Sequence, residues 1–319
     1  MEVKRLEPLF LQPVFKERLW GGTALRDRYG YEIPSELTGE CWAVSAHPQG
    51  LSIILNGSFA GKSLKELWEE HPGLFGHPKE KMFPLLTKIL DANMDLSVQV
   101  HPDDAYAKAH ENGELGKTEC WYVIDCKEDA ELILGHTART REEWKRQMSE
   151  GNWNELLQRI KIKPGDFFYV PSGTVHALCE GTFILETQQS SDTTYRIFDY
   201  HRKDEEGNIR ELHLDKALDV IKIPQSIVGI DPVEEKREHA VITTFIESDF
   251  FSVYKWEMTG CASFEKLGTY TLCSVIKGEG TLKHGFKEYS LKKGDHFILP
   301  ANFGNFMVEG LLELIVSNM

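Results

Sequence analysis

Two side chains that can bind a metal stand close together in residues 96–104, just before a proline. The alternation of residue types in this stretch predicts a strand. In a strand, Gln99 and His101 point to the same face, because successive side chains lie on opposite sides. Pro102 then ends the ladder of hydrogen bonds. We therefore expect half of a metal site at the end of this strand.

The other half of such a site has to come from elsewhere in the chain. The best sources are Glu119, in the segment Gly-Lys-Thr-Glu-Cys-Trp, and His176, at the end of Val-Pro-Ser-Gly-Thr-Val-His. Two imidazoles and a carboxylate suit Zn²⁺ and leave an open position for a substrate, although the same residue types fit iron or manganese. We expect three separated strands to converge on one ion.

His176 closes a motif that matches the second signature motif of the cupin superfamily, whose members are jelly-roll barrels with a metal in the mouth. The motif Gly-x5-Pro-x-Gly-x2-His is formed here by Gly165, Pro171, Gly173 and His176. Proline and glycine at these positions predict a tight turn between two strands. Such a turn determines the direction in which His176 enters the barrel.

An internal repeat indicates that the barrel occurs twice. Residues 165–171 align with residues 294–300, and continuing the alignment sets Asn305 opposite His176. A repeat of this kind implies two related β-barrels or sandwiches. Because the second copy lacks the histidine, we expect the first copy to hold the metal and the second to be structural.

The helices predicted from the sequence are insertions into a β framework. One begins at Ser63 with a Ser-x-x-Glu capping box. Others are expected over residues 102–112, 140–159 and 215–221. Most of the remaining sequence reads as short strands separated by turns. The fold class predicted is mainly β, with two cupin (jelly-roll) β-barrels and helical insertions in the N-terminal half.

The proline, glycine and charge content of residues 224–237 is typical of a domain linker. We therefore predict a catalytic cupin domain over residues 1–236. A C-terminal cupin domain without metal would follow over residues 237–319.

The composition excludes several classes of function. With a net charge of -14 over 319 residues, general binding to nucleic acid or to a membrane surface is not expected, since either needs clustered Lys and Arg. An anionic substrate would need a local basic pocket. The N-terminus lacks an apolar targeting segment, and the six cysteines form no Cys-x-x-Cys pair, so we expect a cytoplasmic protein without disulfides. No obligate protein partner is evident.

The altered first cupin motif points to a particular family. The segments Gln-Val-His-Pro-Asp, Lys-x-Glu-Cys-Trp-Tyr-Val and Pro-Ser-Gly-Thr-Val-His-Ala resemble those of type I mannose-6-phosphate isomerases. The resemblance extends to residues 20–22, 39–45 and 185–196, and so covers essentially the whole chain. It is to the short bacterial form. The chain departs from longer members at Ser191-Asp192-Thr193, where they have Ser-Asp-Asn, and it lacks their large helical domain.

The resemblance implies an enzyme that interconverts mannose 6-phosphate and fructose 6-phosphate through an enediol. It implies one zinc ion per chain, bound by His101, Glu119 and His176, with Gln99 as a fourth ligand that water can replace.

Roles for other residues follow from the same resemblance. Arg196 is implied as an active-site residue, and Ser97 resembles a serine that contacts the substrate phosphate. Lys117 is a candidate for phosphate binding or proton relay. The general base stays open between Glu186 and Lys117.

Less specific interpretations compete with these roles. Arg196 could form a structural ion pair with Asp192 or Asp199. Lys88 and Glu40 lie in family-like segments, but roles at the edge of the core are at least as reasonable, so we leave them out of the catalytic set. Two other functions also fit a metal-binding cupin: an iron oxygenase, and a sugar-binding protein without catalysis.

Overall fold

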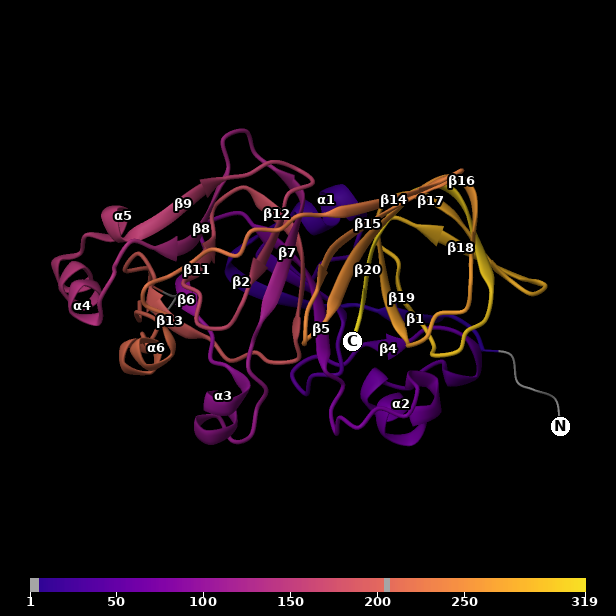
Figure 1. Ribbon diagram of the computed structural model, residues 1–319, viewed down its shortest axis with the longest axis horizontal. Helices are drawn as coiled ribbons and strands as arrows, with labels where there is room; N and C mark the ends of the chain where they lie inside the picture. The colour runs from indigo at the N-terminus through magenta and orange to yellow at the C-terminus, as the bar shows by residue number, and fades with distance from the viewer. Residues whose placement is uncertain (1–5, 204–206) are drawn as a thin grey trace.

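A computed structural model describes residues 6–203 and 207–319, which form a mainly β structure (Figure 1). Within these ranges the strands make three sheets, of nine, six and five strands. The mainly β class predicted from the sequence is confirmed. The nine-stranded sheet consists mostly of C-terminal strands and lies at one end of the molecule, and the other two sheets lie toward the opposite end.

The six-stranded sheet contributes one wall of the N-terminal part. Its order is β10 (Phe167–Val170), β7 (Glu119–Cys126), β12 (Thr182–Gln189), β5 (Leu85–Ala92), β3 (Thr38–Val44) and β2 (Val14–Gly22). Every residue of β3, β5 and β12 is buried, so both faces of these strands are covered. Polar side chains on them must therefore find partners inside the protein.

The five-stranded sheet brings together segments that are far apart in the sequence. Its order is β13 (Tyr195–Phe198), β6 (Val98–Val100), β11 (His176–Leu178), β8 (Glu131–His136) and β9 (Leu157–Lys161). In β6, Gln99 pairs with His176 on one side and with Arg196 on the other. The backbone register thus sets three predicted site residues in neighbouring positions.

The nine-stranded sheet joins the two ends of the chain. Its order is β14 (Val233–Arg237), β15 (Ala240–Glu247), β16 (Ser252–Phe264), β20 (Phe306–Asn318), β17 (Thr271–His284), β19 (His296–Leu299), β1 (Leu9–Gln12) and β4 (Ile53–Ile54), and β18 (Lys287–Lys292) also pairs with β17. Leu9 of β1 pairs with Ile298 of β19. Two N-terminal strands therefore extend the C-terminal sheet. The domain boundary at residue 236 stays a prediction.

Helices lie around the sheets: α1 (Ala24–Tyr29), α2 (Leu64–Glu70), α3 (Asp104–His110), α4 (Arg141–Glu150), α5 (Trp153–Leu156) and α6 (Leu214–Val220), with 3-10 turns η1 (Gly57–Phe59) and η2 (Pro72–Phe75). The capping box predicted for Ser63 and Glu66 is present at the start of α2. None of the helices in the described ranges has the length and apolar character needed to cross a membrane.

Two sequence predictions of local structure are wrong. The helix expected over residues 140–159 stops at Glu150, because Gly151 adopts a left-handed conformation with φ of 72°. Glycine takes this conformation without steric cost and commonly ends helices. The expected linker over residues 224–237 contains β14, since Val233–Arg237 pairs with β15.

An aromatic cluster packs the two halves of the chain together. Trp68 of α2 contacts Phe75, Phe83 and Tyr270, with ring centroids 5.0 to 5.9 Å apart. Tyr270 immediately precedes β17 of the nine-stranded sheet, whereas the other three rings belong to the N-terminal half. Apolar burial therefore stabilises the contact between the halves.

His296 of β19 is buried and contacts Tyr31 of the N-terminal half. Its Nδ1 accepts a hydrogen bond from Ser274 Oγ at 2.9 Å. Its Nε2 lies 2.9 Å from the Tyr31 hydroxyl, which donates its own hydrogen to the Gly294 carbonyl. These contacts suit the neutral imidazole. Burial lowers the pKa of His296 to about 3.

We expect His296 to make stability depend on pH. The unfolded imidazole takes up a proton below about pH 6.5, whereas the folded one stays neutral, so the free energy of unfolding falls as the pH falls. The loss from this residue is about 2 kcal/mol at pH 5. In urea unfolding of the metal-free proteins, His296→Gln should show a smaller decrease in stability on acidification than the wild type. Equal decreases would contradict this account of His296.

Candidate active site

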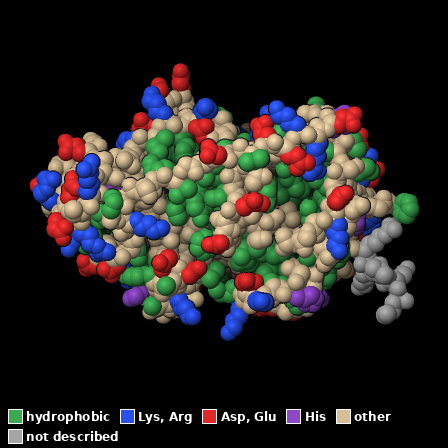
Figure 2. Space-filling model, in the orientation of Figure 1, with side chains coloured by type: hydrophobic (Ala, Val, Ile, Leu, Met, Phe, Trp, Pro, Cys, Tyr) green, Lys and Arg blue, Asp and Glu red, His purple; other side chains and the backbone are tan. Residues whose placement is uncertain are grey.

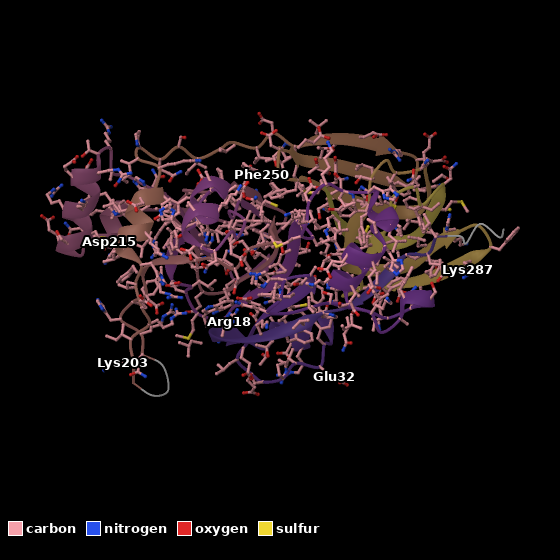
Figure 3. The ribbon with its side chains drawn as sticks, turned by 90° about the horizontal axis from the view of Figure 1, so that it is seen from below. Arg18, Glu32, Lys203, Asp215, Phe250 and Lys287 are labelled. Atoms are coloured by element: carbon pink, nitrogen blue, oxygen red, sulfur yellow. The ribbon has the colours of Figure 1, made fainter. Side chains whose placement is uncertain are left out.

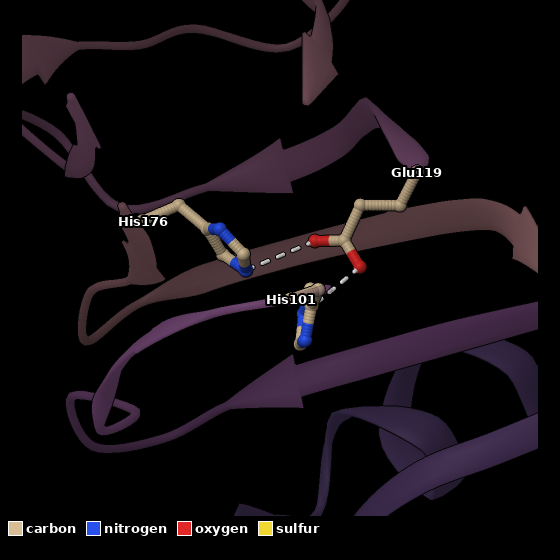
Figure 4. A group of neighbouring side chains, drawn as sticks. All are labelled: His101, Glu119 and His176. Atoms are coloured by element: carbon tan, nitrogen blue, oxygen red, sulfur yellow. Dashed lines mark ion pairs between the residues drawn. The ribbon is translucent and has the colours of Figure 1, made fainter. Parts of the chain in front are cut away.

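Three side chains that could hold a metal ion meet in the N-terminal part (Figure 4). His101 follows β6 directly, and Glu119 and His176 are the first residues of β7 and β11. Glu119 Oε1 lies 3.2 Å from His176 Nε2, and Glu119 Oε2 lies 3.5 Å from His101 Nε2. One atom from each residue lies within 4.8 Å of the others, and all three residues are at most 1% exposed. The structure thus brings together the three residues that the sequence singled out.

Backbone carbonyls determine which imidazole nitrogens face inward. His101 Nδ1 lies 2.9 Å from the Thr193 carbonyl oxygen, and His176 Nδ1 lies 2.9 Å from the Thr174 carbonyl oxygen. Each Nδ1 therefore donates a hydrogen, and each neutral ring keeps a lone pair on Nε2. Outer contacts of this kind orient histidines that bind metals.

The inward-facing atoms are suited to a bound cation. Glu119 Oε1 and His176 Nε2 are buried and have no hydrogen-bond partner among the described residues. Neither atom carries a hydrogen, so their approach is unfavourable without a positive charge. The Lys117 ammonium lies 3.1 Å from both Glu119 Oε2 and His101 Nε2, and these contacts leave Oε1 and His176 unsatisfied. The donor set therefore fits a divalent metal ion.

The protonation states also suit metal binding. Burial and the charge of Lys117 lower the pKa of His101 to about 3, and burial lowers the pKa of His176. Burial alone would raise the pKa of Glu119, but Lys117 and the two histidines outweigh it and hold that pKa well below its ordinary value. At neutral pH the site therefore presents two neutral imidazoles and one carboxylate.

A cavity of about 390 Å³ lies beside this group. Its lining includes every other residue that the sequence proposed for the site: Ser97, Gln99, Lys117, Glu186 and Arg196. A polar cavity of this size next to a metal-binding group can hold a small polar substrate.

Lys88 is a cavity residue that the sequence reasoning set aside. It is 3% exposed, and its ammonium lies 3.8 to 3.9 Å from carboxylate oxygens of Glu40, Glu186 and Asp192. In the register of β5 and β12, Lys88 stands opposite Glu186. A lysine within an otherwise buried strand was the available signal, because a buried charge needs charged partners.

Two arginines of the cavity also escaped prediction. Arg18 of β2, labelled in Figure 3, forms an ion pair with Glu40 at 2.8 Å. Arg210 also lines the cavity and donates to buried Asp199, with its Nε 2.7 Å from Oδ2. On the outer face shown in Figure 2, by contrast, acidic and basic side chains are interspersed. The cavity therefore holds a local group of cations in an acidic protein.

Glu186 can exchange a proton near neutral pH. Trp121 Nε1 donates a hydrogen bond to its Oε2 at 3.1 Å, whereas Oε1 is buried without a hydrogen-bond partner among the described residues. Burial and the nearby charge of Glu119 raise the pKa of Glu186 to about 7. A group with such a pKa is suited to general acid–base chemistry.

Arg196 is held by backbone rather than by a carboxylate. Its Nη1 donates to the Glu211 carbonyl at 2.8 Å, and its Nε is buried without a partner among the described residues. Asp199, considered above as a structural partner, pairs with Arg202 and Arg210 instead. Arg196 therefore keeps hydrogen-bonding capacity and charge in the cavity.

The geometry of the His-Glu-His group predicts that His176→Ala weakens binding of a divalent metal by more than about a hundredfold, because a ligand is lost outright. His136→Ala is a matched control. His136 is also buried, but its Nε2 donates a hydrogen bond to the Lys222 carbonyl, and it does not belong to the His-Glu-His group. Competition with a chromophoric chelator measures both. Similar weakening in the two variants would show that the group does not bind the metal.

Comparison with known proteins identifies the family. The model of the type I phosphomannose isomerase catalytic domain matches residues 9–135, and that of the mannose-6-phosphate isomerase cupin domain matches residues 241–319. A mannose-6-phosphate isomerase of Bacillus subtilis is 57% identical over 98% of this chain and 99% of its own, and one of Streptococcus mutans is 51% identical over 98% of each.

Solved structures agree with the sequence comparison. The crystal structure of mannose 6-phosphate isomerase from Bacillus subtilis superposes with a TM-score of 0.97 at 56% identity, covering 98% of this chain and 100% of that one. A phosphomannose isomerase of Salmonella typhimurium shares the fold, with a TM-score of 0.80 at 17% identity over 98% and 99% of the two chains. The chain therefore belongs to the family of type I mannose-6-phosphate isomerases.

Proposed function

We propose that the protein interconverts D-mannose 6-phosphate and D-fructose 6-phosphate, with one zinc ion bound by His101, Glu119 and His176. The observation that carries the proposal is the buried pair of acceptors, Glu119 Oε1 and His176 Nε2, facing each other beside a cavity that contains cations. Gln99, which lines this cavity, would supply a fourth ligand that water can replace. The names of the close relatives support the same substrates.

The reaction moves a proton between the first two carbons of the open-chain sugar through an enediol. A bound zinc ion supplies Lewis-acid stabilisation for negative charge on the oxygens of these carbons. A side chain must accept the proton and return it. Between the two candidate bases, the contacts favour Glu186. Its Oε1 has no hydrogen-bond partner among the described residues, with the Lys88 ammonium 3.8 Å away, whereas Lys117 contacts both Glu119 and His101 at 3.1 Å.

The other cavity side chains would bind the substrate. Ser97 can donate a hydrogen bond to the phosphate, and Lys117 contributes a positive charge to substrate binding. Arg196, which pairs with no carboxylate among the described residues, can hold a substrate oxygen and stabilise the enediolate. Sugar phosphates are thus the molecules that we propose the protein binds. We also propose that it acts in the cytoplasm.

The purified enzyme should convert mannose 6-phosphate to fructose 6-phosphate, lose the activity with a chelator and regain it with zinc. A coupled assay for fructose 6-phosphate measures this. Oxygen consumption that needs iron would indicate a cupin oxygenase instead. Binding of sugar phosphate by the zinc-loaded protein without turnover would indicate a sugar-binding cupin.

Arg196→Ala should lower kcat/KM by about a hundredfold to a thousandfold, the usual effect of removing a group that stabilises developing charge. Bound zinc should stay at the wild-type level, since Arg196 is not among the proposed ligands. Arg159→Ala is the control, because Arg159 is an exposed arginine that contacts Glu131 and Cys179 and is absent from the cavity lining. Full activity in Arg196→Ala would remove Arg196 from the mechanism.

A further inference from the structure

We propose that Gln188 is a positioning residue for His101. Its side-chain amide holds the loop of residues 189–193 in the conformation in which the Thr193 carbonyl orients the imidazole. The proposal rests on the metal site of the proposed function and adds a residue outside the ligand set. Gln188 is the penultimate residue of β12, is completely buried and does not line the cavity.

Both hydrogens of the Gln188 amide are used within one turn of the chain. Nε2 donates to the Gln189 carbonyl at 2.8 Å and to the Ser191 carbonyl at 2.6 Å. Ser191 in turn accepts a hydrogen bond on Oγ from the Thr193 backbone N–H at 3.3 Å. A continuous set of contacts therefore runs from Gln188 to the residue that anchors His101.

The loop held by Gln188 serves two parts of the site. The Thr193 carbonyl accepts the Nδ1 hydrogen of His101 at 2.9 Å. Asp192, one residue earlier, lies 3.8 Å from the Lys88 ammonium. If the loop shifts, the ring of His101 loses the contact that directs its Nε2 toward Glu119. The expected consequence is weaker metal binding.

The position calls for a neutral side chain with two donor hydrogens. Two carbonyls converge on Nε2, and an amide can donate to both, whereas a carboxylate would present acceptors to them. Gln188 also stands opposite Glu119 in the register of β12 and β7. An ionised glutamate here would add a second negative charge beside a buried carboxylate. Glutamine satisfies both requirements.

The test compares zinc dissociation constants of Gln188→Met, Gln188→Glu and Thr187→Val. Thr187 is the matched control: it is equally buried in the same strand, and its hydroxyl has no hydrogen-bond partner among the described residues, so valine removes no contact. We expect about tenfold weaker zinc binding in both Gln188 variants and wild-type affinity in Thr187→Val. Methionine removes the donor hydrogens without adding a charge, whereas glutamate keeps the side-chain shape but replaces donors by acceptors, so either variant that folds carries the test.

A double-mutant cycle separates positioning from general weakening of the fold. In a His101→Ala background, Gln188→Met should not weaken zinc binding further, because the contact through Thr193 no longer has an imidazole to orient. Unchanged zinc affinity in the Gln188 variants, equal losses in Thr187→Val, or additive losses with His101→Ala would overturn the proposal.

The same measurements distinguish this proposal from the proposed function. Zinc affinity is measured without a sugar and therefore tests the role of Gln188 directly. Absence of turnover in the wild type would reject the isomerase but would not change the outcome of the zinc measurement. If zinc-saturated Gln188→Met regains most of the wild-type kcat with unchanged KM, the residue acts through the metal. A loss of kcat that excess zinc does not restore would contradict a role through His101.

Discussion

The structure of the N-terminal part depends on one buried carboxylate. Glu119 is completely enclosed, and an ion removed from water costs several kcal/mol unless other charges and hydrogen bonds compensate. Lys117 compensates one oxygen, and two neutral imidazoles face the carboxylate with their lone pairs. A further cation between these atoms would satisfy the acceptors that Lys117 does not reach, so the buried group is suited to a metal ion.

The hydrogen-bonded sheets fix the relative positions of His101, Glu119 and His176. His176 pairs with Gln99, Glu119 pairs with Val170 and Gln188, and these registers set the ligand positions through backbone contacts. Carbonyl groups from two loops then orient the imidazoles. The candidate ligands and Glu186 thus stand on or directly after strands that pair on both sides, which limits their motion.

The C-terminal sheet shares the repeat but uses it for packing. The residue aligned with His176 is Asn305, whose side-chain oxygen accepts a hydrogen bond from the Lys266 backbone N–H. At this position the second copy therefore has an asparagine that links two loops, where the first copy has a histidine of the candidate metal site. Through Tyr270 and the pairing of β1 with β19, this sheet supports the N-terminal half rather than standing alone.

The sequence by itself determined the β class and the spacing of His101, Glu119 and His176, because strand alternation and turn residues are local properties. The helix end at Gly151 was a local signal that the predicted range overlooked, whereas the pairing of residues 233–237 as an edge strand depends on tertiary contacts with β15. The cationic side chains of the cavity were the hardest feature to predict from the sequence. The apolar neighbours of Lys88 in the sequence were a signal, but only the register set it opposite Glu186, because charge pairing arises from the packed structure and not from neighbours in the chain.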